Sequence, residues 1–323
     1  MNSPRVGIIG ARRVRQGLGP FVARDLVAAG AIVPCFLVTS ERSIAPALAE
    51  IERHAGVSPR GYVDAERMLD REALDALAIL SPAESHAEYL WRAARHGLAV
   101  LCEKPLVWGA PALETRAEEI ARAFASRGIL LYENCQWPFT LPAFERLHPG
   151  ALASPPRRFR MELQPASRGL QALGDSFSHP LSLLQALLPG DAPEVDQLEV
   201  NPGTGRAAPL TIRFLYRSGA EPCAVEIALW RSQALPRHAA IAIDGRTARR
   251  VVEVVAPETY RLSFAASDRI VPMDDPLTTL VADFVGRLRA PDEADRSSRA
   301  RDIEQRMGLL AELARFYVHP EAP

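Results

Sequence analysis

The sequence predicts a two-domain α/β protein in which a doubly wound parallel sheet is followed by an α+β domain with a mostly antiparallel, open sheet. In the first third of the 323 residues, short apolar runs alternate with amphipathic segments at helical spacing, which is typical of βαβ units. After about Cys135 the runs lengthen and alternate apolar with polar residues, as expected for strands with one covered face. We therefore predict domains of residues 1–134 and 135–323.

In the first domain, five strands are expected, because five short runs are rich in branched apolar residues, as buried parallel strands are. They are residues 5–10, 31–38, 76–81, 99–104 and 128–133. Amphipathic helices are expected between them, and three of these helices run into a glycine, a common C-terminal stop. They are residues 20–30, 45–56, 86–97 and 112–128.

In the second domain, five longer runs separated by Gly, Pro and Asp turns predict strands of an antiparallel sheet. They are residues 158–165, 209–218, 223–232, 239–245 and 248–255. Three helices are expected to pack on one side of this sheet. They are residues 174–190, 274–290 and 297–318.

Composition excludes several classes of protein. The chain is 48% hydrophobic and 24% charged with a net charge of -1, which predicts a folded protein with no global field for nucleic acid or an anionic membrane. Arg12, Arg13 and Arg15 have no interleaved aromatic residues, which also disfavours nucleic-acid binding. The first apolar run is too short for a signal peptide or a membrane span, so we expect a cytoplasmic protein.

The four cysteines stand singly, without the spacing of zinc ligands. They are Cys35, Cys102, Cys135 and Cys223. We expect reduced thiols in the core and no bound metal.

The stretch VGIIGARRVRQGLGP, residues 6–20, is typical of a strand followed by a phosphate-binding loop. In the pattern GxGxxG the first glycine makes the turn, the second admits the pyrophosphate, and the third lets the helix pack on the strand. Gly10 fills the first position, but Arg12 and Arg15 fill the others. Gly10, Ala11, Arg12 and Arg13 are candidate cofactor-binding residues, and an ordinary βα turn is the alternative.

A second candidate element follows the second strand, where an acid normally binds the adenosine ribose of NAD. Thr39 and Ser40 stand in its place, followed by Arg42. Hydroxyl groups with an arginine suit the 2′-phosphate of NADP, so Ser40 and Arg42 are candidate cofactor-binding residues. Ser40 could also cap a helix that begins at Glu41, and the two roles are compatible.

The sharpest motif is Glu103-Lys104-Pro105 at the end of a predicted strand, after a strand, a Ser-Pro turn and a helix ending at Gly97. The carboxyl ends of parallel strands face the ligand, and a lysine there can stabilise an oxygen that becomes an alkoxide as hydride leaves. This arrangement resembles the Gfo/Idh/MocA oxidoreductases, the glucose-fructose oxidoreductase and inositol dehydrogenase group, whose EKP signature it matches.

The resemblance implies further cofactor contacts in the first domain. The backbone of Ser81 and Pro82 would line the cofactor, and Glu103 would fix Lys104. His86, at the start of the next helix, is expected to be a structural cap rather than a catalyst.

A second motif, Asp175 and His179, lies four residues apart and hence on one face of a predicted helix. The resemblance implies that these are the catalytic aspartate and histidine, and the alternative is an N-capping Asp175 with a solvated His179. The family often has an aspartate three residues after the histidine, where this sequence has Ser182. Substrate contacts on that face are therefore expected to differ.

The segment from Tyr132 onward matches the family's crossover into its second domain. Asn134, Gln136 and Trp137 are candidate substrate-pocket residues, although core packing is an equal alternative for Trp137. The C-terminal sheet, with runs such as 211–218 and 225–232, is the expected contact of a homodimer or homotetramer.

Together these residues predict reversible hydride transfer between a nicotinamide, NADP in preference to NAD, and a carbinol carbon of a sugar, cyclitol or related polar metabolite. In oxidation His179 takes the hydroxyl proton, Lys104 stabilises the oxyanion, and Asp175 orients His179; Lys104, Asp175 and His179 also bind substrate. The alternative is a non-redox enzyme of elimination or isomerisation, or a binding protein, because Arg12 would crowd the pyrophosphate if it pointed inward.

Overall fold

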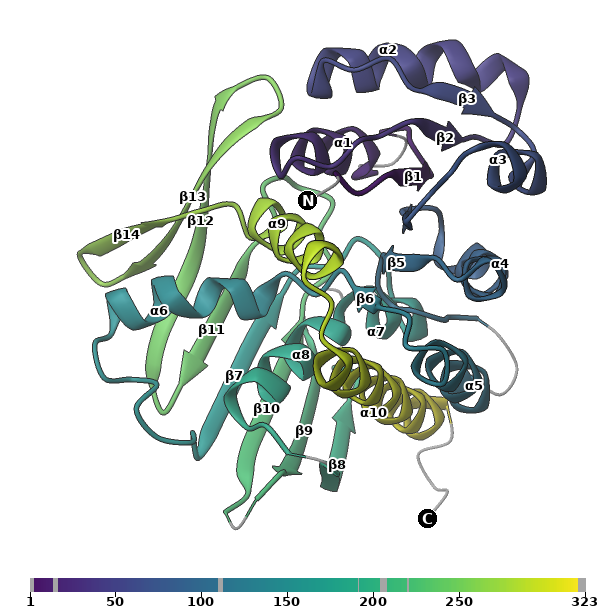
Figure 1. Ribbon diagram of the computed structural model, residues 1–323. Helices are drawn as coiled ribbons and strands as arrows, with labels where there is room; N and C mark the ends of the chain where they lie inside the picture. The colour runs from purple at the N-terminus through teal and green to yellow at the C-terminus, as the bar shows by residue number, and fades with distance from the viewer. Residues whose placement is uncertain are drawn as a thin grey trace. The chain divides into compact units, whose positions relative to one another are not determined.

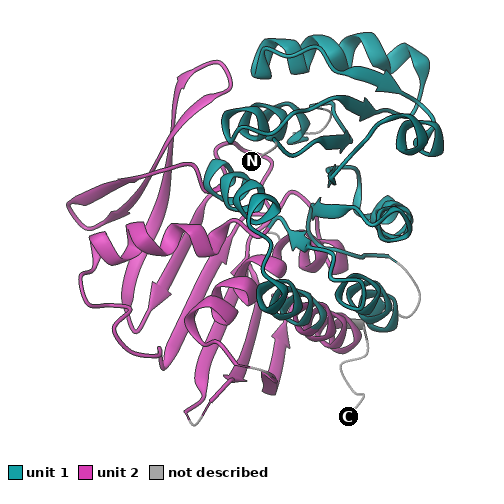
Figure 2. Cartoon of the chain, in the orientation of Figure 1, with its two compact units in different colours: residues 1–134, 277–304 teal, residues 135–276, 305–323 magenta. Residues whose placement is uncertain are grey.

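A computed structural model describes residues 3–13, 17–109, 113–190, 192–203, 208–219 and 221–318 (Figure 1). The chain forms two compact units, the first from residues 1–134 and 277–304 and the second from residues 135–276 and 305–323 (Figure 2). The end of the first stretch coincides with the predicted boundary at 134, whereas residues 277–304, which the prediction placed in the second domain, pack in unit 1.

Unit 1 contains a six-stranded parallel sheet in the order β3-β2-β1-β4-β5-β6. Its strands are β1 (Val6–Ile9), β2 (Cys35–Leu37), β3 (Arg60–Tyr62), β4 (Ala76–Ile79), β5 (Ala99–Cys102) and β6 (Leu131–Glu133). This order confirms the predicted doubly wound fold. Only β3 was not expected, because this three-residue edge strand has a single fully buried position and no apolar run.

Helices cover this sheet. They are α1 (Gly19–Ala28), α2 (Ile44–Ala55), α3 (Ala65–Arg71), α4 (His86–His96), α5 (Leu113–Ala125), α9 (Pro276–Arg289) and the first part of α10 (Glu293–Val318). The seven-residue α3 was not expected. Its start is fixed by Asp64, whose side chain accepts a hydrogen bond of 3.0 Å from the Arg67 N–H and so satisfies one of the first free amides.

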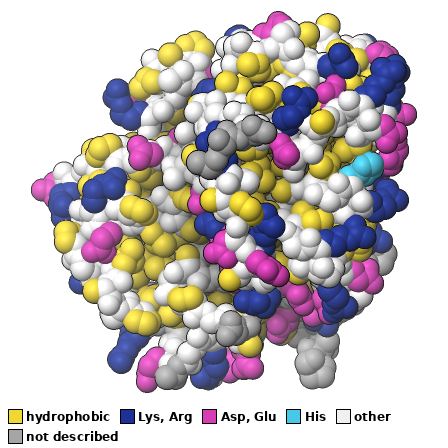
Figure 3. All heavy atoms as spheres, viewed as in Figure 1, with side chains coloured by type: hydrophobic (Ala, Val, Ile, Leu, Met, Phe, Trp, Pro, Cys, Tyr) yellow, Lys and Arg dark blue, Asp and Glu magenta, His cyan; other side chains and the backbone are white. Residues whose placement is uncertain are grey.

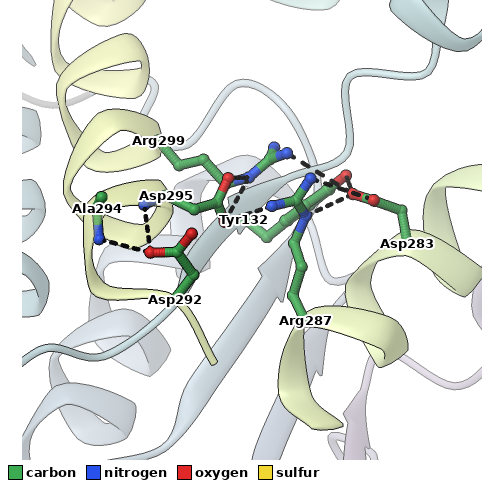
Figure 4. Close-up of polar contacts among 7 residues, drawn as sticks. All are labelled: Tyr132, Asp283, Arg287, Asp292, Ala294, Asp295 and Arg299. Carbon is green, nitrogen blue, oxygen red and sulfur yellow. Dashed lines mark hydrogen bonds and ion pairs between the residues drawn. The ribbon is translucent and has the colours of Figure 1, made fainter. Parts of the chain in front are cut away.

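A charged cluster explains why residues 277–304 belong to unit 1 (Figure 4). Tyr132 on β6 donates a 2.5 Å hydrogen bond to Asp283 of α9, which also accepts from Arg287 at 2.7 Å. Asp295 of α10 pairs with both Arg287 and Arg299. The Arg299 guanidinium also lies 4.5 Å from the centre of the Tyr132 ring. These contacts fasten α9 and α10 to the edge strand of the parallel sheet.

Replacing Asp283 with asparagine is expected to lower the free energy of unfolding by about 1–2 kcal/mol at pH 7, because two arginines then share one carboxylate and the cluster is partly exposed. Burial by itself would raise the pKa of Asp283, but hydrogen bonds from Arg287 and Tyr132 and the charges of Arg287 and Arg299 lower it below its ordinary value. The stabilisation from this carboxylate is therefore complete above the unfolded pKa of about 4 and is lost as the pH falls through the lower folded pKa.

Urea unfolding of the wild type and the Asp283→Asn variant between pH 7 and pH 3 measures this difference. The difference in the free energy of unfolding between the two proteins should stay constant down to about pH 5 and shrink below about pH 4. Asp70→Asn, at an exposed position of α3, is the control and should change stability by less than about 0.5 kcal/mol. A gap that persists undiminished at pH 3 would contradict the electrostatic role of Asp283.

Unit 2 contains an eight-stranded sheet in the order β14-β13-β12-β11-β7-β10-β9-β8. Its strands are β7 (Arg158–Leu163), β8 (Glu194–Asn201), β9 (Leu210–Arg217), β10 (Cys223–Leu229), β11 (Ala239–Ile243), β12 (Arg246–Ala256), β13 (Thr259–Ala266) and β14 (Arg269–Met273). Only β7 and β10 pair in parallel, which confirms the mostly antiparallel sheet. Strands β8, β13 and β14 were not predicted. The edge strands β8 and β14 are largely exposed and β13 begins with three exposed residues, so none of them shows the apolar run that marks a buried strand.

The remaining helical segments of unit 2 are η4 (Trp137–Thr140), α6 (Leu141–Leu147), α7 (Leu170–Ser176), α8 (Ser178–Leu187) and the end of α10. On β9 the buried side chains Leu210, Ile212, Phe214 and Tyr216 alternate with more exposed ones. The other face of the sheet has a hollow with a volume of about 640 Å³. This hollow is lined in part by Glu226 and by Arg160 and Arg213, each of which forms an ion pair with Glu226.

Surface and core agree with the composition. Acidic and basic side chains are interspersed over the face shown in Figure 3. All four cysteines lie in the described part of the chain, are buried and form no disulfide. Burial, followed by the charge of a nearby carboxylate, raises the pKa of Cys35 and of Cys223 to about 12. Among the described helices, none is both long and apolar enough to cross a membrane.

Candidate active site

The loop after β1 contains a glycine that no other residue could replace without strain. Gly10 has φ +86°, and a Cβ atom there would lie 2.6 Å from the carbonyl carbon of Leu80 and the amide nitrogen of Ser81. The chain after β1 therefore passes directly against the chain after β4. This close approach is the one that the first glycine of a phosphate loop provides.

A second glycine, Gly19, lets the first helix approach the strand. Helix α1 begins at Gly19, and a Cβ atom there would lie 2.6 Å from the carbonyl oxygens of Gly10 and Ala11. This contact matches the packing role of the third fingerprint glycine, which the sequence reading placed at Arg15. Arg15 lies outside the described residues. Gly19 was missed because it stands four positions beyond the last position of the fingerprint, although Gly17-Leu18-Gly19 before Pro20 was a visible signal.

The two described arginines of this loop differ in their surroundings. The guanidinium of Arg13 lies 4.5 Å from the centre of the Phe21 ring on α1, and its backbone N–H donates to Glu50 of α2 at 2.7 Å. Arg12 is half-buried, and its Nε has no hydrogen-bond partner among the described residues. Arg13 thus anchors the loop to its neighbouring helices, whereas Arg12 retains hydrogen-bonding capacity for a ligand.

The end of β2 carries hydroxyl groups and an arginine. Thr39 and Arg42 are exposed, and the hydroxyl groups of Ser40 and Ser43 lie 2.9 Å apart. Ser40 precedes the 3₁₀ turn η2 (Glu41–Ser43), but its side chain makes no capping hydrogen bond, so that alternative is not observed. A carboxylate is missing from the two positions where one would select NAD, residues 39 and 40.

Glu103, Lys104 and Pro105 follow β5 at the carboxyl edge of the parallel sheet, and the Lys104–Pro105 peptide is cis. The side-chain amide of Asn134 donates to the Glu103 carboxylate. Burial raises the pKa of Glu103, while the neighbouring positive charge of Lys104 and the hydrogen bond from Asn134 oppose that shift. Glu103 is therefore held beside Lys104 by the residue that follows β6. Asn134, for which a place in the wall of a substrate pocket was predicted, makes this contact to Glu103.

Glu133, which the sequence reading did not select, supports the same loop. It is 4% exposed and accepts a 3.0 Å hydrogen bond from the N–H of Leu106. The N–H of Asn134 donates to the carbonyl of Cys102 at 2.7 Å. The end of β6 therefore supports the loop on both sides of Lys104.

His86 fixes the loop after β4 to the same motif. It is 1% exposed, with Nδ1 lying 3.0 Å from the carbonyl oxygen of Pro105 and Nε2 lying 2.8 Å from that of Ser81. Both partners are backbone carbonyls, so the ring nitrogen that carries the proton donates to one of them. The predicted structural role is thus observed in a different form, as a bridge between the Ser81-Pro82 turn and Pro105 rather than a helix cap.

Lys104 is the single lysine of the sequence, and all the other residues of the two types Lys and Arg are arginines. A guanidinium stays protonated at any ordinary pH, while an ammonium can shift its pKa and exchange a proton. Composition therefore singles out this position, a signal that counting residues could have found.

In unit 2, Asp175 and His179 lie on consecutive helices and not on the single helix predicted for residues 174–190. Helix α7 ends at Ser176 and α8 begins at Ser178, because Pro180 has no N–H for the carbonyl of Ser176. The intervening Phe177 keeps helical angles, φ -73° and ψ -25°, so the chain continues in the same direction. The carboxylate of Asp175 accepts from Ser167 and, at 3.1 Å, from Gln171.

The imidazole of His179 lies edge-on to the ring of Trp137, with centroids 6.4 Å apart. Trp137 is 5% exposed and also packs against Phe264 at 6.5 Å. The half-buried Gln136 precedes it. Ser182, where the family often has an aspartate, donates to the backbone carbonyl of His179 at 2.8 Å and so contributes no free carboxylate to this face.

The described residues contain no group of three or more His, Cys, Asp or Glu side chains that could hold a metal ion. The groups gathered at the carboxyl edge of the parallel sheet are instead a close-packed glycine loop, hydroxyls, a lysine and a bridging histidine.

A parallel sheet in this strand order, with a glycine turn after β1 and ligand-facing loops after β4 and β5, defines a dinucleotide-binding Rossmann domain. Residues 5–134 match the family model described as "Oxidoreductase family, NAD-binding Rossmann fold", the Gfo/Idh/MocA family. The domain built on these residues is similar to that family, which confirms the predicted resemblance and the nicotinamide class of cofactor.

Two curated proteins illustrate the similarity of the sequence. The chain is 35% identical over 135 residues to a dTDP-3,4-didehydro-2,6-dideoxy-α-D-glucose 3-reductase of Actinomadura kijaniata, covering 41% of this chain and 36% of that protein. It is 34% identical over 97 residues to a D-apiose dehydrogenase of Paraburkholderia graminis, covering 30% and 25%. The matches thus span about a third or less of the length of these relatives.

Solved structures share the fold over nearly the whole chain. The UDP-N-acetylglucosamine 3-dehydrogenase of Acidithiobacillus ferrooxidans superposes with a TM-score of 0.69 at 18% identity, covering 97% of both chains. A 3-ketoreductase of Actinomadura kijaniata in complex with NADP superposes with a TM-score of 0.63 at 21% identity, covering 96% of this chain and 97% of that one. The architecture of both units is therefore that of known oxidoreductases.

Proposed function

We propose that the protein is an oxidoreductase that transfers hydride reversibly between NADP and a carbinol carbon of a sugar or a related polar metabolite. The observation that carries the proposal is the position of Lys104, the chain's single lysine, at the carboxyl edge of a Rossmann sheet in the loop held by Glu103, His86 and Glu133. The relatives named above act on sugars or sugar nucleotides, which supports a substrate of that kind.

Lys104 is the group that we assign to the reacting oxygen. The nicotinamide accepts or supplies the hydride when it is bound. As an alcohol becomes a carbonyl, its oxygen develops negative charge, which a neighbouring ammonium stabilises. Hydrogen bonds and charges around Lys104 fix its loop before substrate arrives, so little reorganisation is needed during the reaction.

His179 is the group that we assign to proton transfer, since imidazole exchanges protons near neutral pH. Asp175 is a positioning residue in this proposal, and the hydrogen bonds from Ser167 and Gln171 hold its carboxylate in place. Gln136 and Trp137, which precede and contact this site, would form part of the sugar pocket.

The preference for NADP rests on the residues after β1 and β2. The positions where NAD enzymes carry an acid hold Thr39 and Ser40, Arg42 is exposed beside them, and Arg12 has an unused Nε. A guanidinium binds a phosphate through charge-assisted hydrogen bonds. Gly10, Ala11, Ser81 and Pro82 would lie along the dinucleotide through their backbone atoms, and Glu103 would act beside Lys104.

Titration with NADPH and with NADH, followed by the fluorescence of the reduced nicotinamide, tests this proposal. We expect NADPH to bind at least about tenfold more tightly, and Arg42→Ala and Arg12→Ala each to weaken NADPH by roughly tenfold with little effect on NADH. Arg71→Ala, on the exposed side of α3, should change neither affinity. Binding of neither nucleotide at millimolar concentration would reject the redox proposal in favour of the non-redox alternative.

We also propose that the protein forms a homodimer or homotetramer through the hollowed face of the eight-stranded sheet. Alternating arginine and glutamate side chains on this face, including Arg213 and Glu226, can pair with those of a second copy. The molar mass from light scattering decides the point, and a monomer at micromolar concentration would contradict it.

A further inference from the structure

Two arginines of unit 2, Arg237 and Arg250, lie beside each other. The guanidinium of Arg250, on β12, donates at 3.2 Å to the backbone carbonyl of Arg237, which immediately precedes β11. The Nε atoms of both residues are shielded from solvent and have no hydrogen-bond partner in the described part of the chain. Within that same part, neither residue is paired with a carboxylate.

This arrangement is unfavourable in the absence of a ligand. Burial lowers the pKa of Arg250, and the positive charge of Arg237 lowers it further. Shielding a guanidinium from water is unfavourable unless an anion compensates, and two like charges repel. By contrast, Arg160 and Arg213 of the same sheet are both paired with Glu226. Packing alone therefore does not explain why Arg237 and Arg250 lie together without a carboxylate among the described residues.

The pair lies beside the groups assigned to the substrate. The Arg250 guanidinium is 5.6 Å from the centre of the Trp137 ring, and the same ring contacts His179. The loop that carries Arg237 is also tied to the Asp175 region. Arg231 and Gln233 both donate to the carbonyl of Ala166, next to the Ser167 that holds Asp175.

We infer that Arg237 and Arg250 form an anion-binding subsite beside Trp137, and that the sugar substrate carries a carboxylate or a phosphate that binds there. The inference rests on the proposed function for the identity of the sugar. Both anions present oxygens that match the planar fork of a guanidinium, and both would satisfy the two unused Nε atoms. The Trp137 ring, which contacts both Arg250 and His179, would then lie close to the bound anion and to the carbon that reacts.

Binding of four probes to the protein saturated with NADPH tests the inference by calorimetry. D-Glucose is the neutral probe, D-glucuronate carries a carboxylate, D-glucose 6-phosphate a phosphomonoester, and UDP-glucose a diphosphate. We expect at least one anionic probe to bind about 10- to 100-fold more tightly than glucose, as two charge-assisted hydrogen bonds provide. Which probe gains most distinguishes the carboxylate from the phosphate source.

Two variants and a control test whether Arg237 and Arg250 cause the tighter binding of the anionic probe. Arg250→Met keeps an unbranched side chain over Trp137 but removes the charge, and it should lose at least tenfold in affinity for the preferred anion while leaving glucose unchanged. Arg237→Met, at a partly exposed position before β11, should do the same and serves if Arg250→Met fails to fold. Arg249→Met, the adjacent exposed arginine of β12, points to the opposite face and should match the wild type.

The outcomes separate this inference from the proposed function. Anionic probes that bind no better than glucose, or that bind Arg250→Met and Arg237→Met as tightly as the wild type, would overturn the subsite even if NADPH binds and is oxidised. Loss of NADPH binding would overturn the redox proposal. The anion preference of unit 2 could then still be measured without nucleotide, and its presence or absence would decide the subsite.

Discussion

Alanine at position 104 is expected to lower kcat for NADPH-dependent reduction by roughly a thousandfold, while the affinity for NADPH stays within about twofold. The reason is that the ammonium is assigned to the oxygen on which charge develops, whereas the nucleotide is assigned mainly to backbone groups around Gly10 and Ser81. The measurement is single-turnover oxidation of NADPH with any sugar that the wild type reduces, together with a fluorescence titration of the nucleotide.

Lys104→Arg is the matched variant, because it retains the positive charge but presents a planar group that does not give up a proton. If charge alone suffices, this variant should recover most of the lost rate; if a compact ammonium is needed, it should stay close to Lys104→Ala. Turnover of Lys104→Ala at the wild-type rate would remove Lys104 from the mechanism and with it the main support for the proposed reaction.

Gly19→Ala is expected to weaken NADPH binding by at least tenfold and to lower the free energy of unfolding by about 3 kcal/mol. The added methyl group would lie 2.6 Å from backbone atoms of Gly10 and Ala11, which cannot move without shifting either α1 or the phosphate loop. Urea unfolding and nucleotide titration of the same preparations measure the two effects.

Gly286→Ala in α9 is the control for that substitution, since a methyl group there meets no atom within 4 Å. Alanine in a helix interior is favoured over glycine, so this variant should gain about 0.5–1 kcal/mol. The same chemical change is thus expected to have opposite signs at two positions of unit 1. If Gly19→Ala were as stable and bound NADPH as well as the wild type, the close approach of α1 to β1 could not be essential.

Much of the fold was predictable because buried strands and amphipathic helices leave periodic patterns in the sequence. The elements that escaped prediction lack such patterns. Strand β3 has three residues, β8 and β14 expose most of their side chains at the edges of a sheet, and β13 begins with three exposed residues. The return of residues 277–304 to unit 1 depends on contacts such as the hydrogen bond from Tyr132 to Asp283, and contacts between residues so far apart in the sequence cannot be read from composition.

The residues of the candidate site that lie in short sequence motifs could be predicted, whereas those brought together only by the fold could not. Lys104 and its neighbours were found from three consecutive residues, and Asp175 and His179 from their spacing. The role of Gly19 was not found because Gly19 lies beyond the last position of the GxGxxG pattern, which has a fixed length. The pairing of Arg237 with Arg250 arises because β11 and β12 are adjacent strands, which no local signal at either residue reveals.

The single lysine at the end of β5 also makes the proposed reaction centre spectroscopically addressable. Protein grown with ¹⁵N-lysine would give one side-chain ammonium resonance, so the protonation state of Lys104 could be followed by NMR through nucleotide and substrate binding without assigning the spectrum. The same property constrains handling of the protein, because amine-directed dyes, crosslinkers and coupling resins can attach only at the chain's α-amine or at the residue assigned to catalysis.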